Sequence, residues 1–363
     1  MKTASMIPWS VFLVTSACAT PWDLETVEDG MTVYAITAAT DRDGELTLRI
    51  PVQDEKALLL TVTDDAGLVF VSDINAPGGQ RVFTSSDHWT SDYSVTNGIF
   101  ASNVATINWP ITADDAPLVP GTWVVNVRSE FAYHEITAQV LLKNESDLDD
   151  GFLSASLIYT DGTEGDADLV AATEQAVELW RDLYADIGLD LDLTYDTAPG
   201  RPLLPVPDAE HSEMYTELSE QAALRDVLVV MGSDIDFETD VYGLSGDIPG
   251  PLVPSRKSAV LLSALFASGA DGLFSDTDIQ LLGETMAHET AHFLGLYHPV
   301  EATYDHWDSL DDTQKCSDMG KCIDKLGNNL MFPYPICTAF NCTPQNMLTD
   351  DQRGVMHRYV GVE

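Results

Sequence analysis

The chain has 363 residues, of which 59 are acidic and 17 basic, so its formal net charge is −42 at pH 7. No basic patch is present to neutralise phosphates, which argues against nucleic acid as a partner. The hydrophobic content of 45% is ordinary for a globular protein and argues against disorder. The acidic balance favours solubility, calcium binding and cationic substrates.

Residues 1–20 have the features of an export signal: one lysine, an apolar run too short for a permanent membrane span, then small residues. Ala17-Cys18-Ala19 offers an ordinary cleavage site after Ala19. Ser16-Ala17-Cys18 instead resembles a bacterial lipobox with Cys18 lipidated, although Thr15 replaces the usual leucine. We favour the lipoprotein, with membrane attachment only through Cys18. The protein is then exported, as an outer-membrane or periplasmic lipoprotein or in secreted form.

Residues 21–27 are expected to form a linker, and residues 28–145 a separate accessory domain. This region contains short segments rich in Val, Thr and Ile, separated by Gly, Asp and Pro. Strands at such spacing predict an antiparallel β-sandwich. The region carries no catalytic cluster. Its segment at 119–127 resembles strands of the sandwich domains that accompany secreted bacterial proteases, so a spacer, a substrate-docking module and a folding aid are all open roles.

The texture of the sequence changes near residues 143–151, and residues 151–363 are expected to form the catalytic domain. Strands and helices alternate there, which predicts a mixed α/β layer and an α+β multidomain protein. The expected strands cover 154–160, 191–197, 226–235 and 258–266, and the expected helices 167–188, 213–224 and 275–295. A Gly- and Pro-rich stretch, 241–254, is expected to form a loop before a strand that borders the cleft.

The segment HETAHFLGLYH, residues 288–298, contains the candidate metal-binding and catalytic residues. On a helix, His288 and His292 lie one turn apart on one face, so both imidazoles can bind one ion. Glu289 stands next to the first ligand, where it can act as the general base on a metal-bound water. A bare H-E-x-x-H arises by chance, but Gly295 and His298 at this spacing make an incidental match far rarer.

Gly295 tolerates the left-handed conformation that turns a chain sharply out of a helix, which would bring His298 back as the third ligand. A fourth position stays open, as catalytic zinc requires. Ser275 and Asp278 form a capping-box pattern at the start of this helix, which the sequence predicts to be long and largely buried.

The same residues resemble the metzincins, whose H-E-x-x-H-x-x-G-x-x-H signature precedes a methionine-containing turn beneath the metal. Met331, in NNLMFPYP, is the candidate methionine. The acidic stretch with Asp308, Asp312 and Thr313, the cysteines that follow and Asn329-Leu330-Met331 resemble pappalysin-type enzymes. The resemblance covers residues 151–363 and is strong only after residue 276. It implies a metzincin fold, a catalytic zinc and peptide-bond hydrolysis.

Two positions depart from the pappalysin pattern. Gln314 stands where the pattern has proline, and Tyr334 follows the methionine by three residues instead of two. A tyrosine near the metal can stabilise an oxyanion, so Tyr334 is a weak candidate for that role, with an ordinary packed aromatic as the alternative. Pro299 is closer to serralysin-type enzymes, but the Gly- and Asp-rich calcium repeats of their tails are missing. Serralysin remains a minor alternative.

Four cysteines remain after Cys18, and they flank Met331: Cys316, Cys322, Cys337 and Cys342. An even number in an exported chain predicts two disulfides, with three pairings open. A second zinc site is the alternative, but no C-x-x-C pair is present. At least one bridge is expected to clamp the loop after the zinc helix to the turn below the metal.

The function expected from these observations is that of an exported zinc endopeptidase acting on protein or peptide substrates, as a monomer. The resemblance also implies a structural calcium near Asp308, Asp311 and Asp312, and a solvated acidic loop is the alternative. A decayed peptidase scaffold that serves as a surface binding or adhesion protein stays open, although the intact Glu289 opposes it. A zinc hydrolase for a non-peptide bond is a further alternative.

Overall fold

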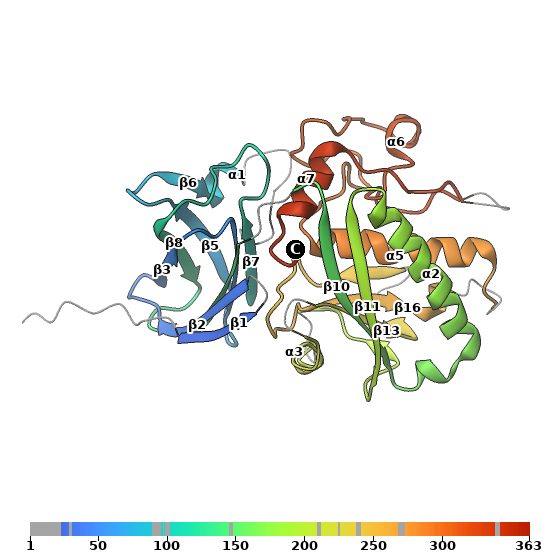
Figure 1. Ribbon diagram of the computed structural model, residues 1–363, viewed down its shortest axis with the longest axis horizontal. Coiled ribbons are helices and arrows are strands. Elements are labelled where there is room, and N and C mark those ends of the chain that lie inside the picture. Colours follow the sequence, from blue (N-terminus) through green and yellow to red (C-terminus); the bar gives the residue numbers. More distant parts are fainter. Residues whose placement is uncertain are drawn as a thin grey trace, which may run out of the picture.

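The computed structural model describes residues 23–28, 31–88, 96, 98, 102–144, 148–208, 212–223, 226–236, 241–267, 273–337 and 342–363. The signal segment, with Cys18, lies outside the described residues. The mixed α+β class is confirmed, with several sheets and few helices (Figure 1). Within the described ranges, no helix is both long enough and apolar enough to cross a membrane.

Two antiparallel sheets make up the N-terminal part. The first has the order β1 (Asp23–Glu28), β2 (Met31–Ala39), β9 (Glu135–Lys143), β4 (Ala57–Thr63) and β7 (Val104–Trp109). The second has the order β3 (Glu45–Val52), β8 (Gly121–Ser129), β5 (Val69–Asn75) and β6 (Arg81–Thr84), followed along the chain by the short helix α1 (Ser85–His88). β1 occupies most of the stretch for which the composition predicts a linker.

Alternation of side chains along the strands builds the core between these two sheets. In β3, Leu48, Ile50 and Val52 are buried while the residues between them are exposed, because successive side chains point to opposite faces. They share one hydrophobic cluster with residues of the first sheet, including the fully buried Trp109. Trp123, on β8, joins the same cluster. The two sheets therefore face each other across one core.

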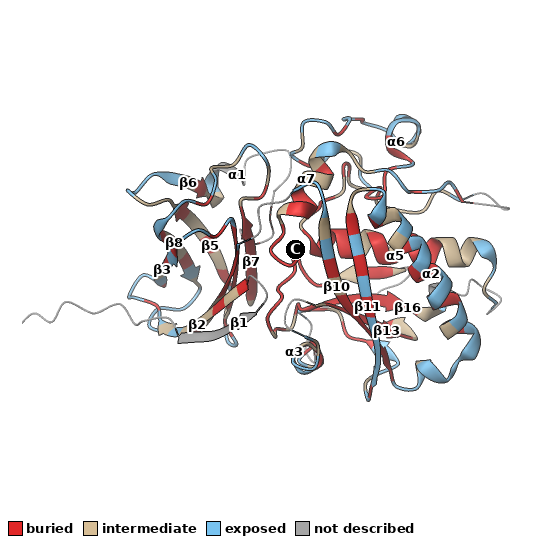
Figure 2. Ribbon diagram, viewed as in Figure 1, coloured by how far each residue is buried: buried red, intermediate tan, exposed pale blue. Residues whose placement is uncertain are grey.

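The first sheet is covered on both of its faces. In β4, Leu58 and Leu60 belong to the core between the two sheets, whereas Leu59 belongs to the core of the C-terminal part. This double burial explains why the strand is a continuous apolar run. β7, buried at every residue, lies at the junction with the C-terminal part (Figure 2).

A third sheet forms the centre of the C-terminal part. Its order is β11 (Leu189–Ala198), β10 (Gly151–Thr160), β13 (Val227–Gly232), β16 (Ala259–Ser263) and β15 (Gly243–Ser245). The first four strands are parallel, and β15 runs antiparallel to β16 at the edge. Helix α2 (Ala167–Ala185) makes the crossover that parallel neighbours β10 and β11 require.

Helices cover both faces of this sheet. α2 and the long helix α5 (Asp276–Phe293) pack on one face in the largest core cluster. α3 (Met214–Ser219) packs on the opposite face. The remaining elements are the 3-10 helix η2 (Thr163–Gly165), β12 (Leu203–Leu204), β14 (Asp234–Ile235), α4 (Ala264–Ala267), α6 (Met319–Leu326) and α7 (Asp350–Arg358). The strand expected over 258–266 ends at Ser263, because Ala264-Leu265 opens a helical turn of good helix formers.

Candidate metal centre

Helix α5 carries the first part of the centre, and its start is capped as its sequence predicts. The Ser275 side chain accepts the Asp278 amide at 3.3 Å, and the Asp278 carboxylate accepts the Ser275 amide at 2.8 Å. The helix is anchored from α2 as well, because the buried Tyr184 hydroxyl donates to the carbonyl of Ala287 at 3.0 Å. The N-terminal cap and the contact with α2 therefore both hold in place the helix that carries His288, Glu289 and His292.

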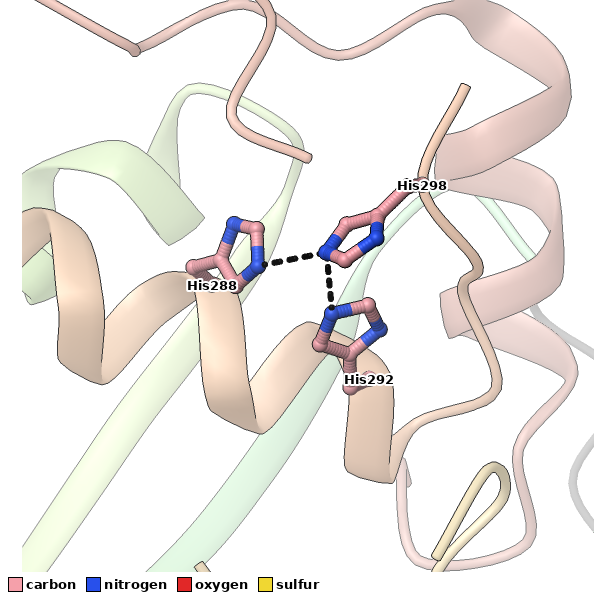
Figure 3. A group of neighbouring side chains, drawn as sticks. All are labelled: His288, His292 and His298. Atoms are coloured by element: carbon pink, nitrogen blue, oxygen red, sulfur yellow. Dashed lines mark hydrogen bonds between the residues drawn. The ribbon is translucent and has the colours of Figure 1, made fainter. Parts of the chain in front are cut away.

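Gly295 ends this helix by the mechanism that its sequence position suggests. Its φ is +108°, a conformation in which a side chain would be strained. The Gly295 amide donates to the backbone carbonyl of His292 at 2.8 Å, and the Leu296 amide donates to the backbone carbonyl of Ala291 at 3.0 Å. These two bonds form a Schellman motif. The chain then reverses, and His298 faces the helix it has just left (Figure 3).

The structure brings His288, His292 and His298 together. One potential ligand atom from each lies within 4.8 Å of the others. The Nε2 atom of His298 lies 3.1 Å from that of His292 and 3.3 Å from that of His288 (Figure 3). Three imidazole nitrogens thus converge on one point.

The outer nitrogen of each ring has an acceptor beside it. His288 Nδ1 lies 2.6 Å from the carbonyl of Leu330, and His292 Nδ1 lies 2.5 Å from that of Leu296. His298 Nδ1 lies 3.1 Å from a carboxylate oxygen of Glu301. Each contact requires a proton on Nδ1, which leaves the lone pair of each neutral ring on Nε2.

This donor set fits a zinc ion. Three nitrogen lone pairs within 4.8 Å of one another repel unless a cation lies between them, and three neutral histidines with an open position are a common catalytic zinc set. Burial and the neighbouring His298 lower the pKa of His288 to about 3. Burial and its two neighbours lower the pKa of His292 well below its ordinary value. Both rings are therefore neutral near pH 7, as metal ligation requires.

Glu289 lies at a cleft beside the histidines. The cleft has a volume of about 200 Å³ and is bordered by α5 and by residues 241–243 and 332–335. Burial raises the pKa of Glu289 to about 8, and the backbone amide of Ser245 opposes that shift. The carboxyl is thus poised to take and release a proton near neutral pH.

Met331 lies in a tight turn, next to the residue whose carbonyl contacts His288. Its side chain is fully buried in the same core cluster as α5. Its amide donates to Asn329 Oδ1 at 2.9 Å, and the Phe332 amide donates to the Asn329 carbonyl at 3.0 Å. The neighbouring Leu330 supplies the carbonyl that orients His288. The turn is therefore tied directly to the first histidine.

Tyr334 borders the cleft, and its hydroxyl is already engaged. It makes a hydrogen bond with the hydroxyl of Tyr304, whose backbone has a φ of +61°. Burial and the Tyr304 hydroxyl raise the pKa of Tyr334 to about 12, so it stays a neutral donor. Its suggested role at an oxyanion remains a prediction.

The four cysteines form two disulfides, but the expected clamp is wrong. The pairs are Cys316–Cys322 and Cys337–Cys342, separated by 6 and 5 residues in sequence. Each bridge closes a short local loop on one side of Met331, so neither joins the post-helix loop to the turn. The cause is the local turn geometry, which places cysteines that are near in sequence next to each other and keeps the two pairs apart. Disulfides are typical of oxidising compartments.

The acidic loop after the third histidine is folded. Asp308 is 4% exposed; its Oδ1 accepts the Leu310 amide at 3.3 Å and the Thr313 hydroxyl. Asp312 accepts the Asp351 amide at 2.9 Å. In the described part of the chain, the three histidines are the one group of three or more His, Cys, Asp or Glu placed to share an ion. Calcium at Asp308, Asp311 and Asp312 stays a prediction.

Reasoning from sequence missed three residues of the site: Glu284, Glu301 and Tyr304. Glu284, 7% exposed, borders the cleft one helical turn before His288. Its Oε1 accepts from the side chain of Gln280 at 2.8 Å and from the amide of Gln345 at 3.1 Å. The four-residue spacing to His288 was an available signal. For Glu301 and Tyr304 the sequence contains no such signal, because a loop conformation brings them to the site.

No family model matches the chain, and no curated protein matches it. Among solved structures, it is similar to archaemetzincin from Methanopyrus kandleri, with 13% identity and a TM-score of 0.28, over 58% of this chain and 88% of that one. It is also similar to metalloproteinase-II from Bacteroides fragilis, with 15% identity and a TM-score of 0.33, over 61% of this chain and 62% of that one.

Proposed function

We propose that this protein is a zinc-dependent endopeptidase, with zinc held by His288, His292 and His298. One observation carries the proposal: three histidine Nε2 atoms converge, each with its outer nitrogen oriented, beside the carboxyl of Glu289 in an open cleft. When bound there, zinc supplies Lewis acidity that polarises a carbonyl and acidifies water.

The remaining steps belong to residues of this chain. Glu289 accepts the proton of the attacking water and passes it to the leaving amine. Strand β15 lies at the sheet edge next to the cleft, with β16 on one side only. The Ser245 amide contacts Glu289, and the other outer backbone groups of β15 are proposed to pair with an extended peptide. Tyr334 is proposed to donate to the developing oxyanion once its hydroxyl leaves Tyr304.

We further propose that the protein is a metzincin of pappalysin-like type and that it acts outside the cytoplasm. The buried turn at Met331, tied to His288 through Leu330, supports the family assignment. The two disulfides and the signal-like residues 1–20 support export. Intact-mass measurement of membrane-extracted protein tests lipidation, because a diacylglyceryl mass on an N-terminal Cys18 arises only in the lipoprotein.

Metal removal tests the zinc requirement. The mature protein, purified with zinc, is incubated with casein and with a quenched peptide library. We expect one zinc per chain, loss of cleavage on treatment with a chelator, and recovery when zinc is returned. A His292→Ala variant serves as the metal-site control and should bind zinc at least tenfold more weakly. Cleavage that survives chelation would remove zinc from the mechanism, and a zinc-loaded protein that cleaves no peptide would favour a binding scaffold or another hydrolase.

A further inference from the structure

The three histidines are oriented by chemically different partners. Backbone carbonyls of Leu330 and Leu296 lie beside His288 and His292, whereas a carboxylate of Glu301 lies 3.1 Å from Nδ1 of His298. A charged acceptor makes a stronger hydrogen bond than a neutral carbonyl does, by about a factor of two. His298 is therefore the one ring of the three whose outer nitrogen has a charged partner.

The position of His298 explains the need for such a tether. His288 and His292 are fixed by a capped, buried helix, but His298 lies after the reversal at Gly295, outside any helix or strand. A ring on a loop has more conformational freedom to lose when it binds a metal. A contact that fixes both its orientation and its tautomer reduces that cost.

Glu301 is itself held in a closed loop. Its amide donates to the carbonyl of His306 at 2.9 Å, and the Tyr304 amide donates to the Glu301 carbonyl at 2.8 Å. The side chains of His298 and Glu301 are 21% and 26% exposed, so the pair is largely shielded from water. The Glu301–His306 loop thus presents the carboxylate from a fixed backbone.

We infer that Glu301 is a positioning residue for the metal centre: its carboxylate holds His298 with Nε2 towards the ion and supplies an anionic partner that offsets the charge of a divalent cation. The inference rests on the proposed zinc site, though not on peptide hydrolysis. Outer carboxylates of this kind raise ligand basicity, and their removal typically weakens metal binding 10- to 100-fold.

The test measures zinc affinity by competition with a fluorescent chelator. Glu301→Ala removes the acceptor, and Glu301→Gln keeps a neutral acceptor of the same length. Asp305→Asn is the matched control, because it removes one exposed carboxylate from the same loop without touching His298. We expect zinc binding about 10- to 100-fold weaker in Glu301→Ala, a smaller loss in Glu301→Gln, and affinity within about threefold of wild type in Asp305→Asn.

A spectroscopic readout separates orientation from stability. With cobalt in place of zinc, the visible absorption of Glu301→Ala should differ from wild type, while Asp305→Asn should match it. Thermal unfolding of the metal-free proteins checks that the variants fold alike. Equal zinc affinity in wild type and both Glu301 variants would overturn the inference. Failure of the proposed function gives a different result: zinc binds, with the graded loss, but no peptide is cleaved.

Discussion

At the scale of single residues, burial places several carboxyl groups where ionisation is costly. Burial raises the pKa of Glu289, of Glu284 and of Asp308. The raised pKa of Glu289 suits the proposed reaction, because that reaction needs a proton acceptor near neutral pH. Asp308 lies in the acidic loop and is not among the residues that line the cleft, so we expect its burial to affect the free energy of unfolding.

We predict that Asp308→Asn alters how stability depends on pH. Burial raises the folded-state pKa of Asp308 to about 7 from an ordinary value of 3.8, against the opposing Thr313 hydrogen bond. The folded state therefore binds the proton more tightly, and wild type loses stability as pH rises from about 4 through 7. Asparagine removes this loss, so the variant should gain up to ~4 kcal/mol relative to wild type between pH 4 and pH 8.

Urea unfolding at a series of pH values, with a chelator of divalent cations present, measures this difference. Asp311→Asn, one charge removed from the same loop, is the control. A free-energy difference between wild type and Asp308→Asn that stays flat from pH 4 to pH 8 would contradict the account. Added calcium that stabilises wild type but not Asp308→Asn at pH 8 would support the calcium site expected there.

At the scale of elements, the cleft depends on how closely edge strand β15 approaches helix α5. A Cβ atom on Gly243 would lie 2.7 Å from Cγ of Glu289 and 2.8 Å from Cγ2 of Thr285. Both distances are shorter than van der Waals contact. Glycine at this position thus lets the strand and the helix form the two walls of the cleft.

Gly243→Ala should therefore displace Glu289 and lower kcat/KM for peptide cleavage by about 10- to 100-fold, because small misplacements of catalytic groups reduce the reaction rate strongly. Zinc affinity should stay near that of wild type, since the three atoms nearest the added methyl group belong to Glu289, Thr285 and Leu261. The control is Gly165→Ala, where a Cβ atom meets nothing within 4 Å. An unchanged kcat/KM in Gly243→Ala would show that the close approach is unimportant.

Elements with strong local signals were predictable from sequence. The capping pair Ser275 and Asp278 and the glycine at 295 correctly located both ends of the motif helix, and the disulfide number followed from the cysteine count. Pairing of the cysteines was not predictable, because it depends on the path of the loops. The same reason hides Glu301: its spacing from His298 is visible, but the turn that aims its carboxylate is not.

At the scale of the whole molecule, the N-terminal sheets and the C-terminal part share a core. Met31 and Leu141, from the first sheet, lie in the same hydrophobic cluster as α5. Asn108 donates to the Arg358 carbonyl at 3.0 Å and accepts the Val360 amide at 3.0 Å. The buried Lys143 ammonium donates to backbone carbonyls near the C-terminus. The N-terminal part is thus built into the catalytic fold.

We predict that residues 151–363 do not form a stable domain alone, because removal of the first sheet exposes the apolar face of this shared core. The fragment should aggregate or unfold at a much lower temperature than the full mature chain, which should unfold in one calorimetric transition. Circular dichroism and calorimetry on both proteins provide the comparison. A soluble fragment with the thermal stability and activity of the full chain would mean that the N-terminal sheets are dispensable.

The central claim is that Glu289 serves as the proton acceptor at a zinc centre that hydrolyses peptide bonds. The most direct measurement is kcat/KM for a peptide that wild type cleaves, compared with Glu289→Gln at equal zinc occupancy. The account predicts that Glu289→Gln binds zinc and is folded like wild type, but cleaves at least ~100-fold more slowly. Equal cleavage of that peptide by the two zinc-loaded proteins would contradict it.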